Sequence, residues 1–341
     1  MRVVTDYILT PIRSKDNLGM SKDKSHIPYW LVLTHDIDVM SLKELPITGR
    51  TFWGFTYRCL VGNFFRFVKK KISLLQYLDS LKTFLFIPAI KLGLAKDPLK
   101  GSIQVMLDIE RKYGVRSTLY FVPYAKRAGH KPDGKLAPSN RCVYYELADY
   151  KDLLVKLEED GWEVGVHGID AYHTLKDAQT EIQVIKDMLP EKKKIGIRIH
   201  WLYHKGQESW QILDSAGYYY DATLGWNDRI GYPEGIYRPF KPKNVSNLTV
   251  LPLNIQDGAL LIYQKLSFDE AWIQIKDILE KASQKQAVVT VLWHNNSYVV
   301  YRYWTDLYKK IIEQAISDGA EIIRAVDAVD NLTILLNNHE L

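Results

Sequence analysis

The stretch Leu31–Asp38 constrains the fold most, because a strand-length apolar run here ends in two carboxylates. Its sequence, Leu-Val-Leu-Thr-His-Asp-Ile-Asp, predicts a buried strand that delivers charge at its C-terminal end. Since strand side chains alternate between faces, Asp36 and Asp38 should project to one side and His35 and Ile37 to the other. Two acids this close need a bound metal, a nearby Arg or a raised pKa on one of them. For the motif taken alone, an exposed turn is the simpler interpretation.

From residue 97 onward, strand and helix patterns alternate over about 240 residues. Strands are predicted at 116–122, 162–167, 195–200, 218–221, 248–253, 287–293 and 321–325. Helices are predicted at 103–113, 150–160, 181–188, 206–216, 268–284 and 303–317. Such alternation is typical of a parallel sheet or a (β/α) barrel. No Gly-rich phosphate loop follows any of these strands, which disfavours a doubly wound nucleotide-binding fold.

The segment 40–99 differs from the rest, because it is rich in aromatic and basic residues at helical spacing and includes the cluster Lys69–Lys71. A pair of core-packed helices capping the main domain is the favoured interpretation. An insertion that lies on a membrane surface, through residues 51–87, or that forms a lid is the alternative. We therefore expect an N-terminal arm at 1–28 and one domain at 29–341, with a mainly helical insertion at about 40–99.

Charge and cysteine content narrow the classes of partner and location. The 45 basic and 40 acidic residues give a net charge of +5, an excess too small for nucleic acid to be the main partner. Cys59 and Cys142 form no metal-binding spacing and suit buried thiols in a reducing compartment. The N-terminus lacks the pattern of a secretory signal, and no apolar run has the length of a membrane span. We expect a cytoplasmic protein, at the membrane surface if the insertion contacts lipid.

Chemically active side chains recur where the predicted strands end. They are Asp36, Asp38, His167, Arg198, His200, Asp221 and His294. In a barrel the C-terminal ends of all strands meet at one mouth, so these side chains should converge although each alone is a weak signal. Asp170 and His173 follow His167 closely and are candidate co-ligands for a metal.

The order of these motifs resembles that of the metal-dependent polysaccharide deacetylases of carbohydrate esterase family 4, the NodB-homology type. The resemblance runs from about Trp30 to the C-terminus, outside the insertion. Its five motifs are similar to Thr34–Asp38, His167–His173, Arg198–Trp201, Tyr220–Trp226 and Val291–His294. The second motif departs from the usual spacing, because Ala171 stands four residues after His167. The resemblance implies a distorted (β/α) barrel of about seven strands.

The resemblance also implies a role for each motif residue. The implied catalytic set is Asp36 as base, Arg198 as its orienting partner, His294 as general acid, and His200. The implied metal ligands are Asp38, His167 and His173, with His200 and Asp170 as competing donors for the third position. Carboxylate and imidazole ligands with water suit Zn²⁺ best.

The activity implied is that of a metal-dependent hydrolase that removes an acetyl group from a sugar or glycan intermediate, with N-acetyl favoured over O-acetyl. Two alternatives stay open at this point. One is a metal-dependent amidase that acts on a small non-sugar amide. The other is a catalytically silent glycan-binding barrel, which the altered second motif would explain.

Overall fold

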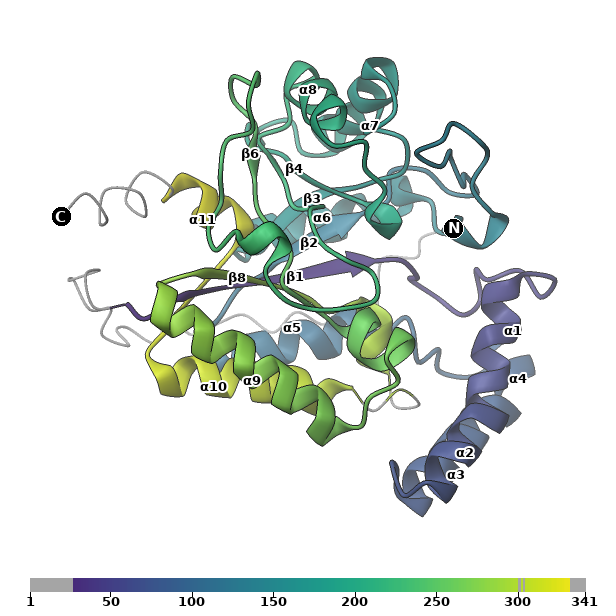
Figure 1. Cartoon of the computed structure of the whole chain (residues 1–341). Coiled ribbons are helices and arrows are strands. Elements are labelled where there is room, and N and C mark those ends of the chain that lie inside the picture. The colour runs from purple at the N-terminus through teal and green to yellow at the C-terminus, as the bar shows by residue number, and fades with distance from the viewer. Residues whose placement is uncertain (1–26, 300–301, 303, 332–341) are drawn as a thin grey trace.

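The computed structural model describes residues 27–299, 302 and 304–331, and its centre is a curled parallel sheet (Figure 1). Hydrogen-bonded neighbours follow the order β6-β5-β4-β3-β2-β1-β8-β7, and β9 pairs with the first residues of β1. The strands are β1 Trp30–Ile37, β2 Thr118–Phe121, β3 Glu163–Gly168, β4 Gly196–Ile199, β5 Tyr220–Asp221, β6 Thr249–Val250, β7 Ile255–Gln256, β8 Val288–Leu292 and β9 Glu321–Ile323. Together with the helices outside it, this sheet confirms the predicted distorted (β/α) barrel. Residues 1–26 of the predicted N-terminal arm lie outside the described residues.

Helices cover the outside of the sheet on both sides of β1 (Figure 1). Their bounds are α5 Ser102–Tyr113, α6 Lys151–Glu159, α7 Leu175–Met188, α8 Gln207–Ala216, α9 Phe268–Lys285, α10 Thr305–Asp318 and α11 Ala325–Asp330. In Figure 1, α7 and α8 lie on one side of β1, and α5, α9 and α10 lie on the other. Each strand therefore points its C-terminal end toward one common mouth, as connections through helices require.

Strand β1 is central and buried along its whole length, and its side chains divide between two environments. Leu31 and Leu33 pack outward into the large apolar core beneath the helices. Trp30 and Val32 point inward and join a smaller cluster inside the barrel. This period of two continues to the end of the strand and places Asp36 on the inner face.

His35 lies on the outer face of β1, opposite Asp36, as predicted. Its Nδ1–H donates to the carbonyl of Trp293 at 2.7 Å, and its Nε2 lies 2.7 Å from Glu110 Oε1 on α5. The same carboxylate accepts hydrogen bonds from Ser117 and Tyr308. A buried hydrogen-bond network therefore fixes the end of β1 from its outer face. Polar groups in a packed interior need such partners.

Two glycines are needed where the barrel interior is crowded by tyrosine rings. A Cβ on Gly196 would lie 1.9 Å from the ring of Tyr220, and one on Gly165 would lie 2.7 Å from Tyr120. Both rings are fully buried, and the Tyr120 hydroxyl donates to that of Tyr220 at 3.1 Å. Glycine on β3 and β4 therefore makes room for the aromatic filling of the barrel.

Most predicted elements differ from the structure by one or two residues at their ends, and two differ in ways that have a clear cause. Helix α7 begins at Leu175 rather than at 181, because Thr174 caps it by accepting from the Asp177 amide. The strand predicted at 248–253 is only Thr249–Val250, and β7 then forms at the opposite end of the sheet order. Pro252, which has no amide hydrogen to donate, stands where the chain leaves β6. In the helix predicted at 303–317, residue 303 lies outside the described residues.

A helical hairpin, residues 50–91, follows β1 and projects from the barrel (Figure 1). It consists of α1 Arg50–Tyr57, a π-helical turn at Arg58–Gly62, α2 Asn63–Val68, α3 Leu74–Leu85 and α4 Ile87–Lys91. Its base packs through a small apolar cluster that includes Leu45, Phe52 and Val299. None of the described helices is long and apolar enough to cross a membrane.

Candidate active site

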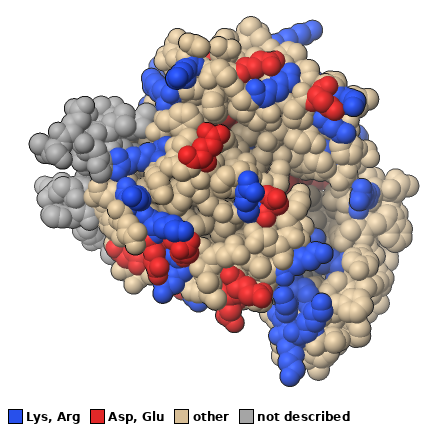
Figure 2. Space-filling model, in the orientation of Figure 1, with Lys and Arg blue, Asp and Glu red and all other residues tan. Residues whose placement is uncertain are grey.

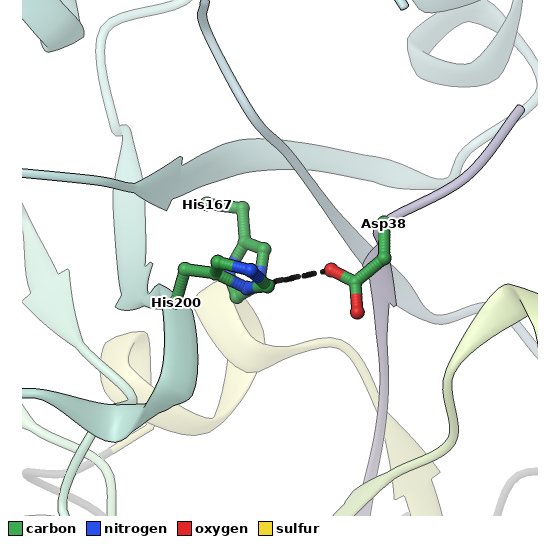
Figure 3. A group of neighbouring side chains, drawn as sticks. All are labelled: Asp38, His167 and His200. Carbon is green, nitrogen blue, oxygen red and sulfur yellow. Dashed lines mark hydrogen bonds and ion pairs between the residues drawn. The ribbon is translucent and has the colours of Figure 1, made fainter. Parts of the chain in front are cut away.

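Three donor side chains converge at the mouth of the barrel, one from each of three strand ends (Figure 3). Asp38 follows β1, His167 lies on β3 and His200 follows β4. Asp38 Oδ1 is 3.4 Å from His167 Nε2 and 3.5 Å from His200 Nδ1. Within the described part of the chain, these three bring their ligand atoms within 4.8 Å of one another.

Hydrogen bonding leaves these donor atoms suited to a cation. His167 Nδ1–H donates to the Arg198 carbonyl at 2.9 Å, so His167 Nε2 carries a lone pair. His200 Nδ1 lies 2.8 Å from that nitrogen, and Asp38 Oδ1 is buried with no hydrogen-bond partner. Zinc bonds of about 2.0–2.1 Å would separate tetrahedral ligand atoms by about 3.4 Å. The two distances to Asp38 Oδ1 match that spacing, whereas the two imidazole nitrogens lie closer together because they share a hydrogen bond. The three residues therefore fit a divalent metal that takes the place of the shared proton.

Electrostatics also favours metal-ready forms of these side chains. Burial, which disfavours the charged imidazolium, lowers the pKa of His200 well below its ordinary value and keeps the ring neutral. Burial would raise the pKa of Asp38, but His200, His167 and His294 outweigh it and hold that pKa well below its usual range. A neutral imidazole and an ionised carboxylate are the forms that bind a metal.

Asp36 and Arg198 form a second pair beside the three donors. Arg198 is fully buried on β4 and donates from Nη1 to Asp36 Oδ1 at 3.0 Å and to Thr34 Oγ1 at 2.8 Å. Its Nε–H donates to the Ala222 carbonyl at 3.0 Å. The other Asp36 oxygen, Oδ2, lies 3.6 Å from His167 Nε2. One carboxylate oxygen is therefore fixed by the guanidinium while the other faces the site.

His294 and Asp257 form a third pair on the opposite side of Asp38. His294 follows β8, and its Nδ1–H donates to Asp257 Oδ1 at 2.6 Å. Its Nε2 lies 3.8 Å from Asp38 Oδ2. Burial opposes the charge on this ring, but Asp257, followed by Asp38 and Asp36, raises the pKa of His294 to about 9. The imidazole is therefore a cation near neutral pH and can give up a proton into the site.

Asp257 and Arg141 are site residues that the sequence did not indicate. Asp257 directly follows β7, a two-residue strand, and also accepts from the His294 amide and the Ser297 hydroxyl. Arg141 is buried and donates from Nη2 to the carbonyls of His200 and Ile169. A place at a strand end could have suggested Asp257, whereas no local pattern marks Arg141.

Other residues singled out in the sequence lie away from the three donors. The His173 amide donates to the Asp170 carbonyl, and this turn packs the His173 ring against His130, with ring centres 5.2 Å apart. Asp170 accepts from the His130 amide at 2.7 Å. Asp221 accepts from Thr223 and from the Trp210 indole. Neither His173 nor Asp170 belongs to the Asp38 group, and His200 occupies the position expected of a third donor.

The backbone beside His200 is unusual. Trp201 and Leu202, the two residues after it, have φ angles of 62° and 54°. Such left-handed conformations are costly for residues with a Cβ and cluster where surrounding structure holds a functional segment in place. Here the Arg141 guanidinium holds the segment in place by donating a hydrogen bond to the His200 carbonyl.

Fold and site together define a distorted (β/α) barrel with a candidate metal centre at the C-terminal ends of its strands. No family model and no curated protein matches the chain. Among solved structures it resembles a candidate polysaccharide deacetylase from Pseudomonas aeruginosa PAO1, at 11% identity and a TM-score of 0.54, covering 89% of this chain and 90% of that one.

Two further solved structures share the fold. A candidate polysaccharide deacetylase from Mycobacterium smegmatis is 12% identical with a TM-score of 0.52, and covers 91% of this chain and 92% of its own. Puue allantoinase is 11% identical with a TM-score of 0.54, and the match covers 94% of this chain and 97% of that chain. The chain therefore has the fold of polysaccharide deacetylases over most of its length.

Proposed function

We propose that this protein is a metal-dependent hydrolase that removes an N-acetyl group from a sugar of a glycan or glycan intermediate. The observation that carries the proposal is the convergence at one mouth of three parts: the Asp38, His167 and His200 donors, the Asp36–Arg198 pair and the His294–Asp257 pair. Each part supplies a different requirement of amide hydrolysis, namely an electrophilic centre, a base and an acid.

Asp38, His167 and His200 would hold the metal, so we assign the third position to His200 in place of the expected His173. Zinc suits this donor set best. A metal held there supplies Lewis acidity, which polarises a carbonyl oxygen and makes water a better nucleophile near neutral pH. His200 would then present Nδ1 without its proton, a change of tautomer that its neutral state allows.

Asp36 and His294 would move the protons. Asp36 accepts a proton from water at Oδ2, because Oδ1 is held by Arg198. His294 donates from Nε2 to the departing nitrogen, and a general acid of this kind contributes roughly 10²- to 10⁴-fold to rate. An amine leaves far more readily once protonated, so a cationic His294 supports N-acetyl over O-acetyl substrates.

The shared fold supports an acetylated sugar as substrate, since two of the three compared structures are named as polysaccharide deacetylases. An amidase acting on a small non-sugar amide is the second candidate, because Puue allantoinase has an equal TM-score to one of them. Both activities would use the same three parts. The size and chemistry of the substrate distinguish them.

The test measures bound metal by mass spectrometry and acetate release from N-acetylated sugar oligomers, with allantoin as the small-amide comparison. The Asp38→Ala variant should lose both metal and acetate release, whereas Asp36→Asn should keep the metal and lose turnover. Wild-type protein that purifies without stoichiometric metal and does not take up zinc would contradict the proposal. It would favour a silent glycan-binding barrel instead.

The third ligand is tested by a matched pair of variants. His200→Ala should lower zinc affinity by about 10-fold or more, because losing even a residue that orients a metal ligand has an effect of that size. His173→Ala, the control on the neighbouring loop, should bind zinc as the wild type does. The opposite result would return the third position to His173.

A further inference from the structure

The helical hairpin exposes apolar side chains to an extent that the barrel does not. Of 22 large hydrophobic residues exposed in the described chain, 14 lie in the hairpin and its short flanks, residues 47–94, which are about a sixth of the described residues. Half of those line the outer part of the hairpin: Val61, Phe64, Phe65, Val68, Leu74, Leu75 and Leu78. Exposed apolar clusters of this kind mark interaction surfaces.

The outer part of the hairpin is held together without these side chains becoming buried. Asn63 Nδ2 donates to Ser80 Oγ at 2.7 Å, and that hydroxyl donates to the Cys59 carbonyl. Phe67 and Tyr77 stack across the two helices with ring centres 5.8 Å apart. The hairpin thus has its own internal contacts, and its outward-facing leucines and phenylalanines remain available to another surface.

The hairpin is also strongly basic. Residues 50–91 contain eight Lys or Arg and one acid, Asp79, so they carry a net charge of +7. The whole chain carries +5, so the remainder carries −2. Lys69, Lys70 and Lys71 form the turn at the tip, beside the exposed apolar residues. Figure 2 shows basic side chains gathered at the lower end of the hairpin and on its side toward the barrel.

The base of the hairpin is fixed to the mouth of the barrel. Helix α1 begins 12 residues after Asp38, and the connecting loop is tied to the site by Asn295, whose Nδ2 donates to the Val39 carbonyl at 2.6 Å. Ser41 Oγ donates to Asp97 at 2.7 Å, which joins the two ends of the hairpin segment. A surface bound by the tip therefore lies on the same side of the protein as the mouth, where β1 points (Figure 1).

We propose that the tip of the hairpin docks on the surface of a lipid bilayer that contains anionic lipid. The apolar residues of α2 and α3 would enter the boundary between headgroups and acyl chains, and Lys69 and Lys70 would contact lipid phosphates, as in amphipathic interfacial helices. Lys71 faces the barrel instead, where it donates to the Lys265 carbonyl and lies 3.9 Å from Glu270. Charge selects this occupant over a second copy of the chain, because a symmetric contact would bring two hairpins of +7 together. This docking goes beyond the proposed hydrolase activity and does not depend on it.

The experiment is co-sedimentation of the full chain with vesicles of phosphatidylcholine alone or mixed with phosphatidylglycerol. The wild type should bind the mixed vesicles and release at high salt. Lys69→Glu with Lys70→Glu should weaken binding by at least about 25-fold, since each basic residue near an anionic surface contributes about fivefold (~1 kcal/mol). Phe65→Ser with Leu75→Ser should weaken binding also at low salt.

The matched control is Lys276→Glu with Ile273→Ser on α9, where Ile273 is 68% exposed. This variant should bind vesicles as the wild type does, and circular dichroism should show all variants folded. Absence of wild-type binding to mixed vesicles, or equal losses in hairpin and control variants, would overturn the proposal. So would hairpin variants that change only the oligomeric state in sedimentation velocity, because a second copy would then be the occupant.

Discussion

The mouth of the barrel and the hairpin beside it differ in which groups they bury: the mouth buries polar side chains, and the hairpin exposes apolar ones. At the mouth, polar groups such as Asp36, Arg198 and His167 are almost fully buried, and each faces a partner. On the hairpin, apolar groups such as Leu75 and Leu85 are exposed, and basic residues far outnumber acidic ones. Both arrangements cost stability in isolation, which indicates that each region is shaped for a contact with something outside the chain.

The two regions also differ in how much the rest of the fold depends on them. Arg198 at the mouth is connected to several strands, because it reaches Asp36 on β1 and Ala222 after β5. The outer hairpin contacts the barrel through hydrogen bonds from Lys71 to the Lys265 carbonyl and from Arg66 to the Arg302 carbonyl. A change at the mouth should therefore alter both chemistry and stability, whereas a change at the tip should alter neither.

Arg198→Ala should give the largest effect. It leaves the Asp36 carboxylate buried without its cation, which typically costs about 3–5 kcal/mol of unfolding free energy. Turnover should fall by more than about 10²-fold, because the base loses the guanidinium that orients it. Urea unfolding and acetate release measure the two effects. Lys82→Ala on the hairpin removes a cation in the same way and should leave unfolding free energy and turnover unchanged within error. A similar loss in Lys82→Ala would contradict the contrast between mouth and hairpin.

Asp257→Asn should have a smaller effect, visible mainly as a change in pH dependence. The pKa of His294 is raised to about 9 by Asp257, so activity that needs the protonated ring persists through neutral pH and falls as pH rises through about 9. Without the carboxylate the alkaline limb of kcat/KM should move down by about 1–3 pH units. An unmoved limb would show that another group donates the proton.

The same pair affects stability with a defined sign. Because the folded pKa of His294 lies above the ordinary value of about 6.5, the stabilisation by Asp257 is complete below about pH 6.5 and is lost as pH rises through about 9. The difference in unfolding free energy between the wild type and Asp257→Asn should therefore shrink with rising pH over that window.

Sequence patterns were sufficient where one local rule decides the structure. The run Leu31–Asp38 alternates as predicted, and Gly114 ends α5 at a φ of 70° where a stop was expected. The positions of Asp36, Asp38 and His167 near the ends of β1 and β3 follow from the same reasoning, because only β2 separates these two strands in the sheet.

Sequence patterns left the answer open where it depends on a contact between distant segments. The choice between His173 and His200 depends on the turn that carries His173 toward His130, and on Arg141, which holds the His200 carbonyl from 59 residues away. The exposure of the hairpin residues was left open in the same way. Helical spacing of aromatics favoured core-packed helices over a membrane-surface insertion, because the spacing predicts a packed face and says nothing of whether the partner lies within the chain.

The smallest effect is expected at the hairpin tip, where Leu75 is 74% exposed. Leu75→Ala removes little buried area, so the unfolding free energy should change by less than about 0.5 kcal/mol. Leu45, which is 3% exposed at the base, is the matched leucine, and Leu45→Ala should cost about 2–5 kcal/mol because it opens a cavity. Chemical denaturation of both variants measures the difference. A cost at Leu75 near that at Leu45 would mean that the tip is buried by the chain itself, and the contrast between mouth and hairpin would then disappear.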